Sequence, residues 1–126
     1  MQSNPVGWFE IYVQDMPRAQ QFYEAVLGIK LSSLPMPDAG ELVMMAFPME
    51  MSLPGASGAL VKVDGFPSGQ NSVLVYFSCS DCAVESGRIT SAGGRIEKEK
   101  MSIGDYGFIA LGYDTEGNMF GLHSMN

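Results

Sequence analysis

The feature that most constrains this chain is an order of local signals that occurs twice. Residues 6–28 read as a strand, a helix-capping aspartate, a helix and a closing glycine, and residues 72–94 repeat that order. Asp81 takes the place of Asp15, 66 positions later. Similar short strand signals come after each copy. An internal repeat of this kind predicts two modules of one architecture, strand–helix–strand–strand–strand.

The first copy shows how its strand and helix are specified. Alternation predicts a strand with two unlike faces. Asp15 can cap the helix, because its carboxylate accepts from free N–H groups of the first turn. Gly28 suits the left-handed backbone that ends many helices. One strand face and the apolar helix stripe are expected in the core: Phe9, Ile11, Val13, Phe22, Tyr23 and Val26. The other strand face carries Trp8, Glu10 and Tyr12.

The remaining pattern completes the two modules, 5–64 and 71–126, within a single domain, 1–126. A second helix is expected over 82–92, with Gly94 in the place of Gly28. Turn chemistry marks 35–40, 102–107 and 114–118. The further strands are expected at 29–34, 42–47, 58–63, 73–79, 95–100, 108–113 and 119–123. The predicted fold class is therefore α+β, with two βαβββ modules whose curled mixed sheets surround a concave cup.

Composition and charge exclude several classes of protein. The net charge of −7 argues against nucleic acid, whose phosphates select basic surfaces. No apolar run approaches the roughly 18 residues that span a membrane, and the first residues lack the features of a secretion signal. We therefore expect a cytoplasmic protein. Cys79 and Cys82 are spaced C-x-x-C, but without a second Cys or His pair for zinc we expect core and surface thiols.

Three runs of the sequence resemble the vicinal oxygen chelate superfamily, which includes glyoxalase I, extradiol dioxygenases and bleomycin-resistance proteins. They are DMPRAQQFYEAVLG at 15–28, AGG at 92–94 with its preceding helix, and DTEGNMFGL at 114–122. The resemblance implies paired βαβββ modules around a cup, often a divalent metal in that cup, and frequent homodimers. It does not decide the activity, because one fold supports different chemistries.

The resemblance also allows a test of the metal site. Metal-dependent relatives usually place His, Glu, His and Glu on four cup-facing strand positions. The corresponding residues here are Trp8, Leu74 and Gly121, and strand 58–63 contains no carboxylate or imidazole. We therefore predict that the usual divalent metal, and any other cofactor, is absent. A rearranged metal site that uses Glu10 and His123 stays open as an alternative.

The cup would still contain polar side chains. The predicted ligand pocket comprises Trp8, Glu10, Tyr12, Tyr76, Gly121 and His123. Glu10 and His123 are the candidate catalytic acid–base pair, since a carboxylate and an imidazole shift each other's pKa. Alternatively, His123 is an inert residue near the chain end, and Trp8 is a packing residue. The methionines Met44, Met45, Met49 and Met51 either line an adaptable pocket or fill the core.

These features support three classes of function. The favoured hypothesis is a small-molecule binding protein of the bleomycin-resistance type, which holds an aromatic or cationic ligand without metal. The second is a lyase or isomerase of the glyoxalase I type that uses Glu10 and His123, although no residue is identified that would stabilise an enolate. The third is a domain that serves assembly only. The sequence leaves open the ligand, whether the modules pair within or between chains, and whether loop 48–57 closes over the cup.

Overall fold

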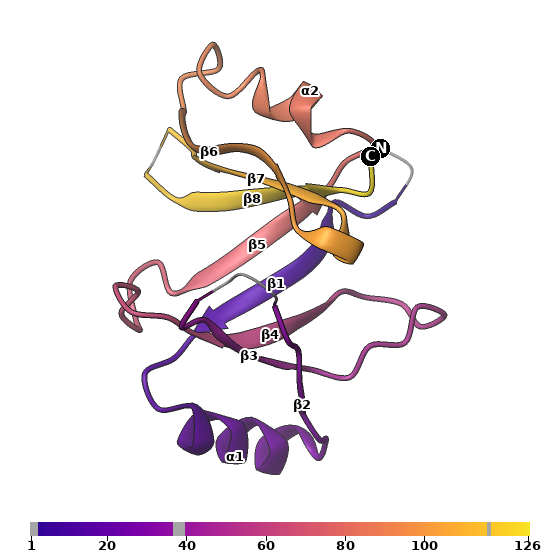
Figure 1. Cartoon of the computed structure of the whole chain (residues 1–126), viewed down its shortest axis with the longest axis vertical. Coiled ribbons are helices and arrows are strands. Elements are labelled where there is room, and N and C mark those ends of the chain that lie inside the picture. Colours follow the sequence, from indigo (N-terminus) through magenta and orange to yellow (C-terminus); the bar gives the residue numbers. More distant parts are fainter. Residues whose placement is uncertain (1–2, 37–39, 116) are drawn as a thin grey trace. The chain divides into compact units, whose positions relative to one another are not determined.

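Two compact units make up the chain in the computed structural model, which describes residues 3–36, 40–115 and 117–126 (Figure 1). The N-terminal unit is Phe9–Val73, and the C-terminal unit combines Met1–Trp8 with Leu74–Asn126. Parts of two predicted turns, 37–39 and 116, lie outside the described residues. None of the described helices is both long and apolar enough to cross a membrane.

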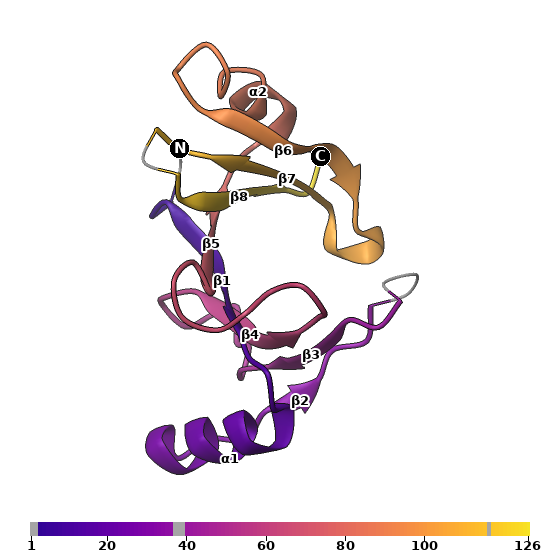
Figure 2. The ribbon, with the colours of Figure 1, turned by 90° about the vertical axis from the view of Figure 1, so that its left-hand side faces the viewer.

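The N-terminal unit contains one helix against one face of a small sheet (Figures 1 and 2). Its elements are most of β1 (Val6–Tyr12), α1 (Met16–Leu27), β2 (Ser32–Ser33), β3 (Val43–Ala46) and β4 (Ser57–Lys62). The strand order is β2-β3-β4-β1, and β3 pairs antiparallel with β2 and β4. β2 covers only two of the residues 29–34 for which a strand was predicted. β3 and β4 agree with the strands predicted over 42–47 and 58–63 to within one residue at each end.

Helix α1 begins and ends where the sequence predicts. The carboxylate of Asp15 accepts a hydrogen bond from the N–H of Arg18 at 3.2 Å. Gly28 ends the helix with a left-handed backbone (φ 66°), and its N–H bonds to the carbonyl of Glu24 at 2.9 Å. The carboxylate of Glu24 also accepts from the N–H of Leu31 at 2.8 Å, which ties the next segment to the helix.

The buried face of α1 differs from the predicted one. Met16 is buried, and Ala19 and Tyr23 pack against the same core cluster. Phe22 and Val26 were expected in the core, but their side chains are 58% and 63% exposed, so that prediction is wrong. Each successive helical residue is turned by about 100°, so the sheet that covers Met16, Ala19 and Tyr23 leaves Phe22 and Val26 exposed. The cluster comprises Val13, Met16, Leu31, Phe47 and Leu60, with Phe9 and Ile11 packed against it.

The C-terminal unit repeats the order of elements (Figure 1). It contains the start of β1, β5 (Val73–Ser78) from Leu74 onward, α2 (Cys82–Ser86), β6 (Arg95–Ser102), the 3-10 turn η1 (Gly104–Tyr106), β7 (Phe108–Tyr113) and β8 (Met119–Ser124). The strand order is β1-β5-β8-β7-β6. β5 and β8 run parallel, whereas β7 is antiparallel to β6 and β8, so the sheet is mixed. The α+β class with two βαβββ modules is confirmed.

Helix α2 is much shorter than predicted. It ends at Ser86, and successive turns replace the helix expected over 87–92. Gly87 comes directly after the last helical residue, and glycine inside a helix costs about 1 kcal/mol relative to alanine. Gly93, rather than Gly94, has the positive φ of 101°. Gly94 is instead a close-packing position, because a Cβ there would lie against the carbonyl oxygen of Tyr113.

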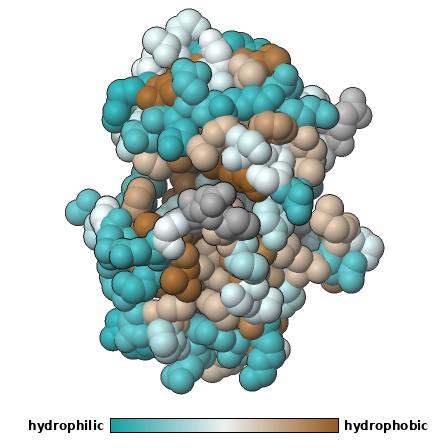
Figure 3. All heavy atoms as spheres, in the orientation of Figure 1, coloured by the Kyte–Doolittle hydropathy of each residue, from teal (hydrophilic) through white to brown (hydrophobic). Residues whose placement is uncertain are grey.

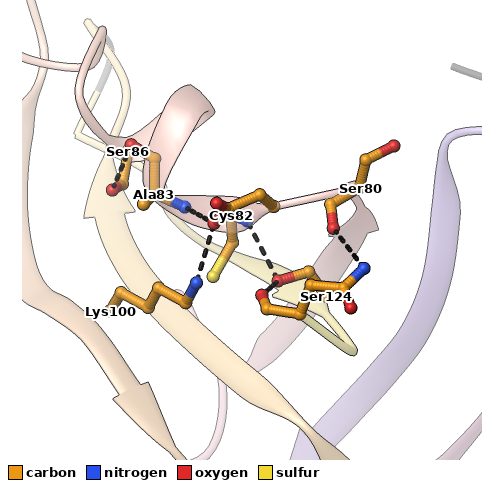
Figure 4. Close-up of polar contacts among 8 residues, drawn as sticks. Ser80, Cys82, Ala83, Ser86, Lys100 and Ser124 are labelled. Atoms are coloured by element: carbon orange, nitrogen blue, oxygen red, sulfur yellow. Dashed lines mark hydrogen bonds and ion pairs between the residues drawn. The ribbon is translucent and has the colours of Figure 1, made fainter.

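The start of α2 is fixed by residues from distant parts of the C-terminal unit (Figure 4). Asp81 accepts from the N–H of Ala83 at 3.0 Å and pairs with Lys100 Nζ at 2.8 Å. The N–H of Cys82 donates to Ser124 Oγ at 3.0 Å. The Cys82 thiol is fully buried in the second core cluster, with Ile89, Ala110 and Leu122, and Cys79 packs against that cluster. Both cysteines are free thiols.

The pair formed by Asp81 and Lys100 makes stability depend on pH. The hydrogen bond from Lys100 and then the Ala83 N–H hold the pKa of Asp81 below its ordinary value of 3.8. Because the pKa of Asp81 is lower in the folded state than in the unfolded state, the ionised carboxylate stabilises the fold at pH values above the ordinary pKa. This stabilisation is lost as the pH falls through the lower, folded-state pKa. Asp81→Asn should therefore lower Tm at pH 7, and the difference from wild type should shrink below pH 3.8.

Thermal unfolding followed by circular dichroism between about pH 7 and about pH 2.5 spans this titration range and measures the effect. Glu97→Gln, on an exposed side chain of β6, is the matched control and should leave the pH profile unchanged. A Tm difference for Asp81→Asn that stays constant over the whole pH range would contradict the prediction.

Candidate functional site

Glu10 and Tyr12 form a polar pair on the face of β1 that points away from α1. The hydroxyl of Tyr12 donates to Glu10 Oε1 at 2.7 Å. Glu10 is 8% exposed. On neighbouring β4, Leu60 packs with the α1-side core, so Ala59 and Val61 lie on the opposite face, where both are fully buried. A carboxylate in such apolar surroundings needs a hydrogen-bond donor, and the Tyr12 hydroxyl supplies one.

Phe66 extends this pair into an aromatic surface. Its ring stacks on the ring of Tyr12, with centroids 5.1 Å apart and planes at 24°. Gln14 Nε2 donates to the Phe66 carbonyl at 2.8 Å, and Ser68 Oγ donates to the Tyr12 carbonyl at 2.9 Å. These bonds fix segment 64–70 against the end of β1. Phe66 is not among the residues predicted for the ligand pocket, and its only signal in the sequence is that it is an isolated aromatic residue in a Gly-, Pro- and Ser-rich stretch.

Tyr76 and Gly121 lie side by side in the C-terminal unit. They are register partners in the parallel pair β5/β8, and Tyr76 is 6% exposed. A Cβ at position 121 would overlap the Tyr76 ring. Gly121 takes the place where the superfamily resemblance puts the closing glutamate. The tyrosine ring therefore occupies the space that a side chain at position 121 would need.

This packing predicts strong coupling between positions 76 and 121. Gly121→Glu, which restores the residue of metal-dependent relatives, should destabilise the fold by roughly 1–3 kcal/mol, because it overpacks the site. In the background of Tyr76→Ala the same substitution should cost less. Urea unfolding of the two single variants and the double variant measures the coupling free energy. Free energies that add within error would show that the tyrosine ring does not block position 121.

His123 has a defined hydrogen-bond partner. Its Nε2 lies 2.6 Å from the carbonyl oxygen of Tyr106. Because a carbonyl only accepts, Nε2 must carry the proton, and this tautomer leaves Nδ1 as the acceptor in the neutral ring. His123 is half-buried and belongs to the C-terminal unit, whereas Glu10 belongs to the N-terminal unit. The acid–base pair of Glu10 and His123 stays a prediction.

The residues at the usual metal positions do not fit a metal of that kind. Trp8 is half-buried, Leu74 is buried, Gly121 has no side chain, and the side chains of β4 include no carboxylate or imidazole. No group of three or more His, Cys, Asp or Glu residues that could hold a metal occurs within 3–36, 40–115 and 117–126. Metal dependence stays untested, and the prediction of no cofactor stays a prediction.

Two cavities among the described residues contain none of the six residues predicted for the pocket. One, of about 380 Å³, lies beside the start of α1 and is lined in part by Gln14, Arg18 and Phe22. The other, of about 300 Å³, lies beside α2 in the C-terminal unit.

Hydrophilic side chains form a band over β6 on the surface shown in Figure 3.

The four methionines that the sequence assigns either to an adaptable pocket or to the core differ in burial. Met44 is buried and Met45 packs against the core, which agrees with a filling role. Met49 and Met51, in the segment 48–57, are 50% and 97% exposed. Closure of this segment over the predicted cup stays a hypothesis.

Known proteins resemble the chain in sequence over part of the first module and in fold over nearly its full length. The family described as Bleomycin resistance protein-like N-terminal matches residues 6–48. No curated protein matches the sequence. A Streptomyces coelicolor methylmalonyl-CoA epimerase in complex with 2-nitronate-propionyl-CoA superposes with a TM-score of 0.67 and 15% identity, and the match covers 96% of each chain.

Two further solved structures are similar to this chain in fold. Methylmalonyl-CoA epimerase from Mycobacterium tuberculosis has a TM-score of 0.69 and 18% identity over 97% of this chain and 88% of the epimerase. A hypothetical protein from Bacillus halodurans C-125 has a TM-score of 0.73 and 12% identity over 99% of this chain and 96% of that chain. The match over residues 6–48 and the shared fold support the resemblance to the vicinal oxygen chelate superfamily that the sequence motifs indicated.

Proposed function

We propose that this protein binds a small aromatic or cationic organic molecule at the surface formed by Glu10, Tyr12 and Phe66, without the usual divalent metal. The observation that carries the proposal is the 2.7 Å hydrogen bond from the Tyr12 hydroxyl to the Glu10 carboxylate, within an otherwise apolar sheet face. A carboxylate held in one orientation can pair with a cation at little further cost in side-chain entropy.

The aromatic rings favour the same class of ligand. The stacked rings of Tyr12 and Phe66 offer π-faces that attract cations and aromatic groups. Phe66 is 43% exposed, so part of this surface is open to solvent. The net charge of −7 adds a long-range attraction for cations. Ligand recognition here would therefore combine one carboxylate with aromatic contact.

The ligand of the epimerase neighbours differs in charge from the ligand that we propose for this protein. Their ligand contains coenzyme A, whose phosphates a chain of net charge −7 repels. We therefore expect acyl-CoA compounds to bind more weakly than cations. A glyoxalase-type lyase or isomerase that uses Glu10 and His123 is the alternative, and metal-dependent turnover of a carbonyl substrate would favour it.

Glu10→Gln should weaken binding of an aromatic cation without unfolding the protein. Loss of a charged hydrogen-bonding group costs roughly 1.5–3 kcal/mol, which is about a tenfold loss of affinity or more. Benzyltrimethylammonium is the probe, with isothermal titration calorimetry as the measurement and EDTA present throughout. Glu41→Gln, an exposed carboxylate of the same unit, is the matched control.

Three outcomes would contradict the proposal. They are no binding by wild type, equal binding by Glu10→Gln, and binding that EDTA abolishes and Ni²⁺ or Zn²⁺ restores. A large fall in Tm for Glu10→Gln alone would assign Glu10 to the fold rather than to a ligand.

We also propose a homodimer, as the resemblance implies. Phe22, Val26 and Leu27 leave an exposed apolar strip on α1, with 58%, 63% and 55% of their surfaces accessible. If a second copy covers this strip, Phe22→Ser combined with Val26→Ser should shift the protein to a monomer in sedimentation-velocity experiments. Wild-type protein that sediments as a monomer would refute this.

The cytoplasmic location stays a prediction from sequence.

A further inference from the structure

Segment 64–70 carries Phe66 across the end of β1. The Phe66 ring stacks on the ring of Tyr12, with centroids 5.1 Å apart. Neither core cluster of the described residues includes Phe66, and the residue is 43% exposed. Core packing therefore does not determine where this ring lies, and hydrogen bonds of the segment are the other means of holding it.

The backbone of this segment follows an unusual path. Gly65 and Gly69 have positive φ angles of 93° and 81°, and Gln70 has one of 41°. A positive φ is uncommon for a residue other than glycine, and Gln70 is the single such residue in the part of the chain that the structure describes. Backbone of this kind persists where surrounding contacts fix it. The segment therefore needs contacts that hold it against β1.

Gln14 and Ser68 supply such contacts. Because a carbonyl only accepts, the Gln14 atom that lies 2.8 Å from the Phe66 oxygen is the donor Nε2. The same amide also donates to Ser68 Oγ at 3.4 Å. Ser68 can accept this bond, since its own proton goes to the Tyr12 carbonyl at 2.9 Å. These three bonds join the backbone of Phe66 to the backbone of Tyr12.

The fold of the N-terminal unit does not explain why a donor stands at position 14. Asp15 alone caps α1 by a side-chain hydrogen bond, and Gln14 and Ser68 are both exposed. Hydrogen bonds that compete with water add little to the free energy of unfolding. Their clearer effect is to keep the Phe66 ring beside Tyr12.

We propose that Gln14 and Ser68 are positioning residues that hold Phe66 as an aromatic wall of the binding surface. This wall makes the surface prefer aromatic cations to aliphatic cations of the same size. The exposed part of the Phe66 ring stacks on an aromatic ligand, and stacking adds to the effect of apolar area alone. A ring that is already held in place loses little freedom when the ligand binds. The inference rests on the proposed function and narrows its ligand to aromatic cations.

Benzyltrimethylammonium and its saturated analogue, (cyclohexylmethyl)trimethylammonium, test the preference. The two cations have equal charge and similar size, so the ratio of their Kd values isolates the aromatic contact. In isothermal titration calorimetry, wild type should bind the aromatic cation about threefold more tightly or better. Gln14→Met keeps the length of the side chain but removes the donor, and should abolish most of this preference. Ser68→Ala should reduce the preference in part.

A matched control and a second readout separate positioning from a structural role. Gln21→Met makes the same substitution at an exposed residue of α1 and should keep the wild-type ratio. A purely structural role for Gln14 would weaken the binding of both cations together and leave the ratio unchanged. Without ligand, para-fluorophenylalanine in place of Phe66 reports the stacking by its ¹⁹F shift. This shift in Gln14→Met should move toward that in Tyr12→Leu, which lacks the stacked ring.

The inference fails if Gln14→Met keeps the wild-type ratio or the wild-type ¹⁹F shift. It also fails if wild type binds the two cations equally. In these cases the proposed function stands, because wild type still binds a cation. Wild type that binds neither cation contradicts the proposed function, and the preference falls with it. If Gln14→Met does not fold, Ser68→Ala breaks the same chain of bonds and decides the question by the same ratio and shift.

Discussion

Both modules depend on an aspartate that starts a helix directly after a strand. The carboxylates of Asp15 and Asp81 accept N–H groups of the first helical turn, and both residues keep an extended backbone. This arrangement turns the chain so that the helix covers one face of its own sheet. The opposite face is then left for residues such as Glu10 and Tyr76. Capping thus decides which side chains pack beneath a helix and which lie on the opposite face of the sheet.

The two modules differ in the length of the helix after the cap. α1 continues for 12 residues and packs Met16, Ala19 and Tyr23 onto its sheet. α2 stops after 5 residues, and turns cover the rest of its sheet less completely. A cavity of about 300 Å³ lies beside α2. The two modules therefore share the order of their elements but differ in how much of the sheet each helix covers.

The sheet faces away from the helices differ from those of metal-dependent relatives. Gly121 has no side chain, and the ring of Tyr76 fills the adjoining space. In the N-terminal unit, Glu10 keeps a carboxylate that a tyrosine hydroxyl holds in place. These features suit hydrogen bonding and aromatic contact better than coordination by several ligands. The proposed binding of a cation rests on that chemistry rather than on the activity of structural neighbours, which share the fold at low identity.

Local interactions explain the part of the structure that the sequence by itself determined. The cap at Asp15, the left-handed Gly28, the alternating strand β1 and the order of elements all depend on contacts within a few residues. Only the tertiary structure decided which stripe of α1 is buried, since Phe22 and Tyr23 are both aromatic and the sheet covers one of them. The same holds for Phe66 on Tyr12, 54 positions apart in sequence, and for Tyr76 over Gly121. Such contacts depend on strand pairing and chain return, and no local pattern in the sequence encodes them.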